Sequence, residues 1–349
     1  MSQAHGFQTI LGRDLIGELK HFVHRPFLVV TMEDLWPRFT EAFDGAECEA
    51  YLVRSVDEED LLRDLSILPD FAAVVGLGGG MAIDTAKYFA WRRRRPLFQV
   101  QTALSMNAAW GHRAGVRVNG VVRYVGWAVP EAIYIDLDVI RAAPLALNLS
   151  GIGDILCCHT GVLDWKYAAA RGRCEAKWPF DPELAAEAEA TVDNVLAHLD
   201  DIRDLTDTGI RVLVEGLARG TSYHTNGWNP RPIEGIDHFF FYALEFGTGR
   251  KFIHGPPVCL GIAIGSLLHR SRAEEMLRAF HHVGLDIRPE AMGVTWDDVA
   301  RALAGLRGFV RDAGLWHSIA HDVEIGPDFV PDLRHRIEAL YGPWAPATR

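Results

Sequence analysis

Short apolar runs alternate with amphipathic segments through the first 145 residues of the chain. Runs with the character of buried strands lie at 27–32, 51–53, 71–75, 97–100 and 132–135. Helical patterns lie at 36–43, after the first strand, and at 57–65, after the second. Further along, Asn119-Gly120 stands between two apolar runs and predicts a hairpin over 116–125. Because strands and helices alternate, this part of the chain is predicted to form a parallel, doubly wound sheet.

From residue 149 onward, the apolar positions repeat almost entirely with the period of an α-helix. Helices are predicted at 149–170, 182–205, 210–223, 239–246, 257–268, 272–283, 296–305 and 332–341. Proline and glycine clusters at 229–232 and 255–257 interrupt the series. The predicted fold class is therefore a Rossmann-like α/β domain over 1–146, followed by an all-α domain over 147–349.

Composition and charge narrow the class of protein. The chain has 349 residues, 49% of them apolar, and its 35 Lys and Arg against 46 Asp and Glu give a formal net charge of −11. An acidic surface repels nucleic-acid backbones, so we expect no nucleic-acid partner. The 5 cysteines form no CxxC pair, which argues against a thiolate zinc site and a disulfide framework. Neither a signal-peptide pattern nor an apolar window of about 18–20 residues is present, and we expect a cytoplasmic protein without a membrane span.

A glycine-rich turn follows the third predicted strand, at residues 76–80, and leads into a helical pattern. Its three consecutive glycines would let the backbone approach a pyrophosphate, and the first N–H groups of the helix would face the anion. The pattern is neither GxGxxG nor a P-loop, so by itself it is equally typical of a structural turn. Asp84, near the start of the helix, would stabilise the helix dipole on either interpretation.

Asp154, His238 and His254 are candidates for a metal site. The two histidines are 16 residues apart, too far for one helical face, but glycines at 247 and 249 would allow the chain to turn between them. One carboxylate and two imidazoles would hold Zn²⁺ or Fe²⁺ and leave a coordination position open to a substrate oxygen. Because the chain has 15 histidines, spacing alone does not single out this pair.

Three motifs occur in order along the chain: GGGxxxDxAK over 78–87, GxxD followed by Asp164-Trp165 over 151–165, and HGxxVxxG over 254–261. In combination they resemble the superfamily that groups dehydroquinate synthases, iron-containing alcohol dehydrogenases and sn-glycerol-1-phosphate dehydrogenases. The Asp-Trp pair is typical of the glycerol-1-phosphate dehydrogenase branch. The resemblance covers residues 71–265 and implies a dehydroquinate synthase-like fold and a homo-oligomer.

The resemblance also implies a function and a set of site residues. It implies a metal-dependent, NAD(P)-linked dehydrogenase that reduces a small ketone or aldehyde, most directly dihydroxyacetone phosphate to glycerol 1-phosphate. The metal, zinc before iron or nickel, would be bound by Asp154, His238 and His254 and would act as a Lewis acid on the substrate oxygen. The residues implied at NAD(H) or NADP(H) are Gly78, Gly79, Gly80, Asp84, Lys87, Thr102 and Ser105, of which the last two lie in a stretch resembling PTxxSxD.

Three positions depart from the pattern of the branch. Asn107 stands where the branch has aspartate, Gln101 replaces a proline, and Tyr242 replaces the second histidine of SEHxxxH. Asn107 and Tyr242 are therefore candidates for contact with the substrate. Their replacement bears on whether glycerol phosphate itself is the substrate.

Basic residues would be needed for the small anionic substrate that the resemblance implies. Arg250 and Lys251, shortly before His254, are candidates for binding its phosphate group, and Arg113 is a further candidate. Taken singly, Arg250 and Lys251 are each read more readily as a surface cation.

Two other functions remain open. Residues 107–116 can be aligned with the DSSVGGKTGVN stretch of dehydroquinate synthases, which makes a sugar-phosphate cyclase an alternative. Against it, the LNxGHTxGHA segment is absent, and so is the ExxK pattern, since residue 154 is Asp and residue 157 is Cys. A catalytically inactive relative is the second alternative, suggested by Asn107 and Tyr242. Retention of the three candidate ligands opposes it, because buried polar groups without a metal are costly.

Overall fold

The structure is a computed structural model that describes residues 8–118, 121–222 and 229–345. Its packing divides the chain into two compact units, Met1–Asn148 and Leu149–Arg349. The boundary predicted from the sequence lies at 146/147. The two units are described separately.

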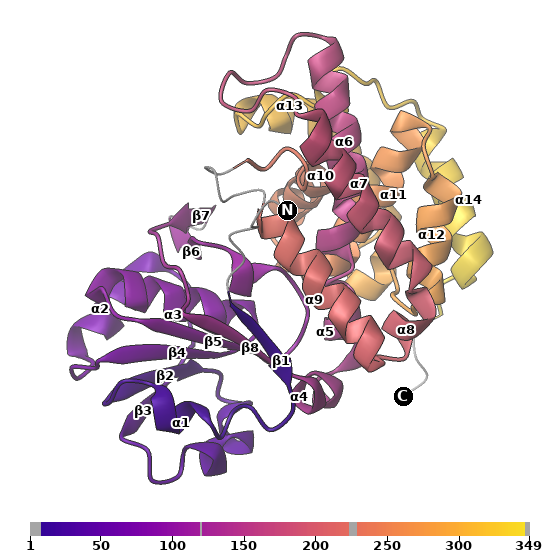
Figure 1. Cartoon of the computed structure of the whole chain (residues 1–349). Coiled ribbons are helices and arrows are strands. Elements are labelled where there is room, and N and C mark those ends of the chain that lie inside the picture. The colour runs from indigo at the N-terminus through magenta and orange to yellow at the C-terminus, as the bar shows by residue number, and fades with distance from the viewer. Residues whose placement is uncertain (1–7, 119–120, 223–228, 346–349) are drawn as a thin grey trace. The chain divides into compact units, whose positions relative to one another are not determined.

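The N-terminal unit contains a six-stranded sheet in the order β1-β8-β5-β4-β2-β3, and every neighbouring pair is parallel. Figure 1 shows the strands side by side. They are β1 (Thr9–Gly12), β2 (Phe27–Thr31), β3 (Cys48–Leu52), β4 (Ala73–Gly78), β5 (Leu97–Gln101) and β8 (Ala132–Asp136). The predicted doubly wound sheet is confirmed, and β1 is an additional edge strand that the sequence pattern did not indicate.

Alternate residues of the central strands supply the two sides of the core. On β2, Leu28 and Val30 face the cluster that includes α2 (Glu58–Ile67) and α3 (Gly80–Arg93), and Phe27 and Val29 face the opposite cluster. All four side chains are almost completely buried. Helices α2 and α3 therefore cover one face of the sheet, and α1 (Leu19–Phe22) covers the other (Figure 1).

Of two further elements predicted in this unit, the structure contains the hairpin but not the helix. The helix expected over 36–43 is replaced by two 3₁₀ turns, η1 (Trp36–Arg38) and η2 (Thr40–Phe43), which are separated at Phe39, where the backbone leaves the helical conformation with φ −122°. The expected hairpin is present as β6 (Ala114–Val118) and β7 (Val121–Val125), paired antiparallel. Its turn, Asn119-Gly120, lies outside the described residues. The short elements η3 (Ala108–Trp110) and α4 (Leu137–Ala142) complete this unit.

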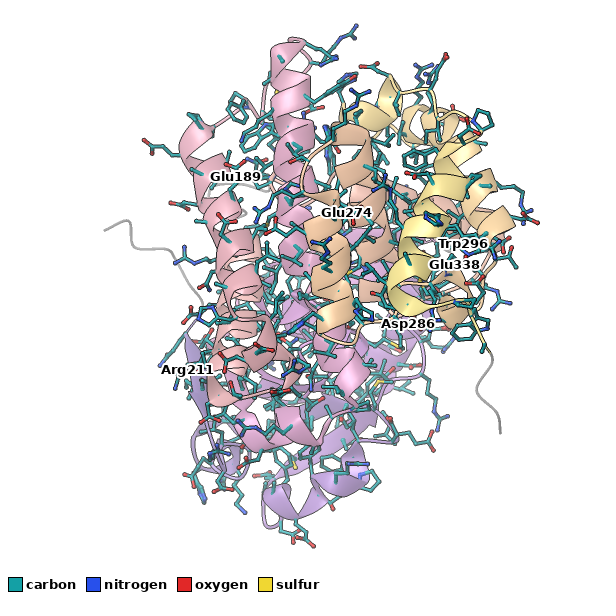
Figure 2. The ribbon with its side chains drawn as sticks, turned by 90° about the vertical axis from the view of Figure 1, so that its right-hand side faces the viewer. Glu189, Arg211, Glu274, Asp286, Trp296 and Glu338 are labelled. Carbon is teal, nitrogen blue, oxygen red and sulfur yellow. The ribbon has the colours of Figure 1, made fainter. Side chains whose placement is uncertain are left out.

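In the C-terminal unit, the residues that the structure describes form helices and turns, as predicted. The helices are α6 (Gly153–Ala170), α7 (Pro182–Ala197), α8 (Leu199–Arg203), α9 (Asp207–Ser222), α10 (Ile236–Thr248), α11 (Gly255–His269), α12 (Ala273–His282), α13 (Trp296–Asp312) and α14 (Phe329–Tyr341), with 3₁₀ turns η4 (Pro289–Met292) and η5 (Ile319–His321). The helix expected over 149–170 is divided into α5 (Leu145–Ser150) and α6, and the helix over 182–205 is divided at His198. Figure 2 shows polar side chains on the outer helices, among them Glu189, Glu274 and Glu338.

Helix α6 lies at the centre of this unit, packed against α7, α9, α10 and α11. The segment Leu145–Ala170 is long and apolar enough to cross a membrane by length and composition, but 83% of its apolar window is buried inside the structure. Asp154 and Asp164 lie within it and are also buried. The burial is that of a core helix, which explains the high hydropathy of α6 without a membrane.

Candidate active site

Asp154, His238 and His254 converge in the C-terminal unit. Asp154 lies in the first turn of α6, His238 near the start of α10, and His254 immediately before α11. Their donor atoms all lie within 4.8 Å of one another. The Nε2 atom of His254 is 2.7 Å and that of His238 3.9 Å from Oδ1 of Asp154. The structure thus brings together the three residues proposed as metal ligands.

Glycines allow the three helices to approach closely enough for these side chains to meet. A Cβ atom at Gly255 would stand 2.0 Å from the carbonyl oxygen of Ser150, and one at Gly261 would stand 2.3 Å from that of Asp237. A Cβ atom at Gly153 would be 3.1 Å from the carbonyl oxygen of Gly255. Backbone therefore packs against backbone at the starts of α6 and α11, and α10 lies directly on α11.

A helix followed by a return segment brings the two histidines together, although they are 16 residues apart in the sequence. From His238, α10 runs for about 15 Å at 1.5 Å per residue, and it ends at Thr248, where Gly249 adopts the left-handed conformation with φ 64°. The five residues from Arg250 to His254 can cover about 17 Å in extended form, enough to return along the helix. The ring centroids of His238 and His254 are consequently 5.2 Å apart.

A buried carboxylate orients the ring of His238. Oδ1 of Asp237 is 2.5 Å from Nδ1 of His238, and Oδ2 accepts a hydrogen bond of 2.6 Å from the hydroxyl of Thr160 on α6. Asp237 is completely buried. Because Nδ1 is engaged in this contact, Nε2 is directed to Asp154. The sequence interpretation missed Asp237, although a carboxylate directly before a ligand histidine was a usable signal.

Asp164 fixes the start of α10. Its side chain accepts hydrogen bonds from the backbone N–H of Ile236 at 2.6 Å and of Ile319 at 2.8 Å. Nε2 of His269 lies 2.9 Å from the same carboxylate. The aspartate of the Asp-Trp pair therefore joins α6, α10, α11 and η5 and holds the element that carries His238.

The surroundings of His238 are acidic. Burial opposes the charged imidazolium, but Asp237, Glu234 and Asp154 outweigh burial and raise the pKa of His238 to about 9. Burial raises the pKa of Glu234, which accepts a hydrogen bond from the hydroxyl of Tyr242. The ring centroid of Tyr242 lies 6.0 Å from that of His238. Tyr242, the candidate substrate residue, is thus next to the ligand cluster and linked to Glu234.

The cluster has the composition and size of a divalent metal site. Around a tetrahedral Zn²⁺ with bonds of about 2.0–2.1 Å, ligand atoms lie roughly 3.3 Å apart, and the separations of 2.7 and 3.9 Å bracket that value. Burial raises the pKa of the thiols of Cys157 and Cys259 well above the ordinary value, so neither offers a thiolate at neutral pH. The donor set is therefore one carboxylate and two imidazoles, which fits a catalytic metal with an open position.

The glycine-rich turn lies in the N-terminal unit, at the carboxyl end of β4. Gly78 is the last residue of the strand, with φ +154°, and Gly79 precedes α3. A Cβ atom at Gly79 would meet nothing within 4 Å in the described part of the chain, whereas one at Gly80 would stand 2.4 Å from the sulfur of Met106. The turn thus stands at the start of a 14-residue helix, where the first backbone N–H groups have no partner within the helix, the arrangement that binds anions.

The loop after β5 borders this turn. The backbone N–H of Thr102 donates to the carbonyl oxygen of Gly78 at 3.1 Å. Gln101, which replaces the proline of the branch, is buried, and its amide donates to the carbonyl oxygens of Ala103 and Met106 at 2.9 Å each. This side chain shapes the loop that carries Ser105 and Asn107, both of which are half-buried.

The other predicted residues occupy different surroundings. Asp84 and Lys87 project from α3 onto the segment 108–115. Arg113 is exposed and its guanidinium lies 3.4 Å from the carbonyl oxygen of Tyr124. Arg250 and Lys251 are exposed on the return segment that ends at His254.

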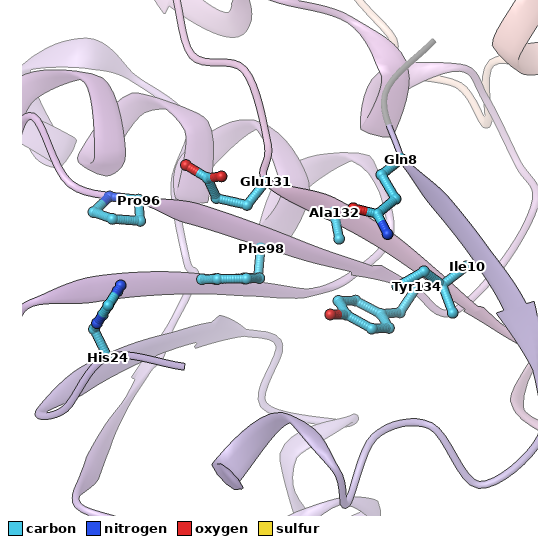
Figure 3. Close-up of a pocket in the computed structure, with 8 residues that line it drawn as sticks. All are labelled: Gln8, Ile10, His24, Pro96, Phe98, Glu131, Ala132 and Tyr134. Carbon is cyan, nitrogen blue, oxygen red and sulfur yellow. The ribbon is translucent and has the colours of Figure 1, made fainter. Parts of the chain in front are cut away.

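A cavity of about 320 Å³ in the N-terminal unit lies away from the predicted site. It is lined by Gln8, Ile10, His24, Pro96, Phe98, Glu131, Ala132 and Tyr134 (Figure 3). Pro96 and Glu131 directly precede β5 and β8, so the cavity lies at the amino ends of the parallel strands. Ligands of such sheets bind at the carboxyl ends, where the glycine-rich turn lies.

Comparison with known proteins identifies the class to which this fold belongs. The profile of the family described as iron-containing alcohol dehydrogenase matches residues 30–144. A probable glycerol dehydrogenase from Sinorhizobium meliloti has the same fold, with a TM-score of 0.72 over 96% of both chains at 21% identity. Glycerol dehydrogenase from Schizosaccharomyces pombe is similar, with a TM-score of 0.70 over 96% of this chain and 89% of that one. The fold is that of the iron-containing alcohol dehydrogenases.

Sequence comparison identifies the branch. Glycerol-1-phosphate dehydrogenase [NAD(P)+] of Thermofilum pendens is 31% identical, with 80% of this chain and 82% of that protein covered. The enzyme of the same name from Thermoplasma acidophilum is 30% identical over 74% of this chain and 73% of that protein. The chain belongs to the glycerol-1-phosphate dehydrogenase branch of the iron-containing alcohol dehydrogenase superfamily, as its motifs indicated, and it is an enzyme.

Proposed function

We propose that this enzyme is a metal-dependent, NAD(P)-linked dehydrogenase that interconverts a polyol phosphate and its ketone, with glycerol 1-phosphate and dihydroxyacetone phosphate as the pair. The observation that carries the proposal is the convergence of Asp154, His238 and His254 within 4.8 Å. Membership of a branch whose relatives are named glycerol-1-phosphate dehydrogenase [NAD(P)+] supports the substrate and the cofactor.

In the proposed reaction, different residues would bind the metal, orient a ligand histidine and bind the dinucleotide. A divalent cation, zinc in our proposal, would be held by Asp154, His238 and His254 and would supply Lewis-acid stabilisation of the oxygen charge that develops during hydride transfer. Asp237 holds the His238 ring in the orientation that presents Nε2. Backbone N–H groups at Gly79 and Gly80 would bind the pyrophosphate of the dinucleotide.

The environment of Tyr242 supports a role in binding the substrate. Its hydroxyl donates a hydrogen bond to Glu234, and a phenolic oxygen can also accept one, which is the contact that we propose with a substrate hydroxyl. We assign the half-buried Asn107 to the same role on the N-terminal unit. The exposed Arg250 and Lys251, on the segment that ends at His254, are our candidates for the phosphate group, with Arg113 as the further candidate.

We also propose a small anionic substrate as the partner, a homo-oligomer and a cytoplasmic location, with no nucleic-acid partner. The free state of all five cysteines, Cys48, Cys157, Cys158, Cys174 and Cys259, is consistent with a reducing compartment.

Metal reconstitution followed by substrate assays tests the proposal. The purified enzyme is stripped with a chelator, reloaded separately with Zn²⁺, Fe²⁺ or Ni²⁺, and supplied with NADH or NADPH. Dihydroxyacetone phosphate, dihydroxyacetone and aliphatic aldehydes are then compared as substrates. We expect metal-dependent oxidation of the reduced cofactor, fastest with the phosphorylated ketone.

Two controls sharpen this test. Asp154→Ala should lose both the bound metal and turnover, whereas Asp312→Ala, an exposed aspartate in the same unit, should retain both. The proposal fails if the metal-loaded enzyme oxidises neither cofactor with any of these substrates. Release of inorganic phosphate from a sugar phosphate without net change in NADH would instead indicate a cyclase.

A further inference from the structure

The ammonium group of Lys87 is completely enclosed within the N-terminal unit. Its side chain is 1% exposed, and its Nζ atom lies 2.7 Å from Oδ1 of Asp84. It also donates to the carbonyl oxygens of Ala108 at 2.9 Å and Arg113 at 2.8 Å. An ammonium group has three N–H bonds, and each has an acceptor here, so none remains for a cofactor phosphate.

Asp84 contributes from the same helix. The backbone N–H of Gly115 donates to its carboxylate, and a Cβ atom at residue 115 would stand 2.9 Å from Oδ2. The side chain of Asp84 is 17% exposed. One turn of α3 thus holds the segment 108–115 at both ends, through two backbone carbonyls and one backbone N–H.

The held segment is well placed to affect the site. Trp110 within it is buried, and its indole N–H donates to the hydroxyl of Thr9 at 3.0 Å. The loop just before it carries Ser105, Met106 and Asn107, and the sulfur of Met106 packs at the position that a Cβ of Gly80 would take. The conformation of 108–115 therefore sets where this loop meets the glycine-rich turn.

We propose that Lys87 and Asp84 are positioning residues, which hold the segment 108–115 and the loop carrying Asn107 beside the glycine-rich turn and do not themselves touch the dinucleotide. This reassigns two residues that the motif placed at the cofactor. The proposal rests on the proposed function only where it concerns the substrate, because the contacts themselves lie within the N-terminal unit.

The test compares Lys87→Met with Arg92→Met, which removes an exposed cation from the same helix. Three quantities are measured: the Kd for NADH by fluorescence at low and high salt, the KM and kcat for dihydroxyacetone phosphate, and hydrogen exchange of residues 105–118. For Lys87→Met we expect a Kd for NADH within about threefold of the unaltered enzyme. Exchange of 105–118 should be at least tenfold faster, with a raised KM for the ketone. Arg92→Met should change none of the three.

Two outcomes overturn the proposal. One is a rise of tenfold or more in the Kd for NADH in Lys87→Met that shrinks at high salt, which would mean that the ammonium contacts a phosphate. The other is unchanged exchange of 105–118, which would mean that the ammonium does not hold the segment.

Further variants keep the test decisive. Should Lys87→Met fail to fold, Asp84→Asn tests the other contact, because it weakens the carboxylate that accepts from the backbone N–H of Gly115. Exchange of 105–118 should then be faster with the Kd for NADH within about threefold of the unaltered enzyme. Unchanged exchange would overturn the role of Asp84, and a Kd raised tenfold or more would mean that Asp84 contacts the dinucleotide. Lys87→Arg should recover part of the protection from exchange. If the unaltered enzyme binds no NADH, the proposed function fails, and the exchange measurement alone decides whether Lys87 and Asp84 hold the segment.

Discussion

The acidic surroundings of His238 make a specific prediction about metal binding and pH. In the protein without metal, His238 has a pKa of about 9, because Asp237, Glu234 and Asp154 outweigh the effect of burial. A metal ion that binds Nε2 must displace this proton. At pH 7, two units below that pKa, proton competition weakens metal binding by about 100-fold, or about 3 kcal/mol. The apparent affinity should therefore rise about tenfold per pH unit between pH 7 and 9.

Replacing Asp237 by Asn should change this profile in a defined way. Without the carboxylate, the pKa of His238 falls toward its ordinary 6.5, and proton competition at pH 7 nearly disappears. The neutral amide also makes Nε2 a poorer ligand, and loss of such a partner costs about 10–100-fold in metal affinity. Above pH 9 the variant should bind metal about 10–100-fold more weakly than the unaltered enzyme, and near pH 7 the two affinities should be about equal.

The measurement is a competition titration between the enzyme and a chelator of known affinity, repeated from pH 7 to 9.5. Thr160→Val is the matched control: it removes the hydroxyl bonded to Asp237 but keeps the carboxylate, so it should retain the slope of the unaltered enzyme. Parallel profiles for the enzyme and Asp237→Asn would refute the reasoning, because they would mean that Asp237 does not set the protonation of His238.

Stability without metal gives an independent check of the same effect. A pKa raised in the folded state stabilises the protein fully below the unfolded value of 6.5, and this contribution is lost as the pH rises through about 9. The metal-free enzyme should lose about 3 kcal/mol of unfolding free energy over that interval from this group. Urea denaturation should show a much smaller loss for Asp237→Asn, and an equal loss would contradict the assignment.

Three further predictions concern packing and substrate binding. Gly265→Ala would place a methyl group 2.5 Å from a side-chain carbon of α10 and should destabilise the protein by about 1–3 kcal/mol in thermal unfolding. Gly305→Ala is the control: its methyl group would meet no atom of the described residues within 4 Å, and it should stabilise the protein by about 0.5–1 kcal/mol. Tyr242→Phe should raise the KM for the polyol phosphate about tenfold without altering metal content, and an unchanged KM would remove Tyr242 from the substrate site. Arg250→Ala and Lys251→Ala should raise the KM for a phosphorylated ketone far more than they lower kcat, and the assignment fails if neither KM changes.

The fold was predictable where a pattern spans a whole element. The run at 27–32 is apolar except for Thr31 because β2 is buried on both faces, and the hairpin follows from the apolar runs on either side of Asn119-Gly120. The strand β1 was missed because its four half-buried residues are too few to establish a period. The division of the helix over 149–170 was missed because the apolar pattern continues across the break between α5 and α6.

The ligand cluster was predictable from motifs and not from spacing. His238 and His254 meet because a helix is followed by a return segment, and the length of that segment matters as much as its sequence. Asp237 is adjacent to His238 in sequence, yet its carboxylate also accepts a hydrogen bond from Thr160, which is 77 residues away on α6. A sequence pattern can indicate that a residue type fits a metal, but the second partner that fixes its orientation comes from a different element.

Lys87 shows why the contacts of a motif residue do not follow from the motif. The acceptors that enclose its ammonium group include the carbonyl oxygens of residues 21 and 26 positions further along the chain. Carbonyl oxygens belong to every residue type, so no side-chain pattern identifies which of them a buried lysine will reach. The same holds for Gly255 and Gly261, whose importance lies in the backbone that approaches them. In this enzyme, the motifs indicated that Asp154, His238 and His254 converge, whereas the contacts that Lys87, Gly255 and Gly261 make with backbone groups required the structure.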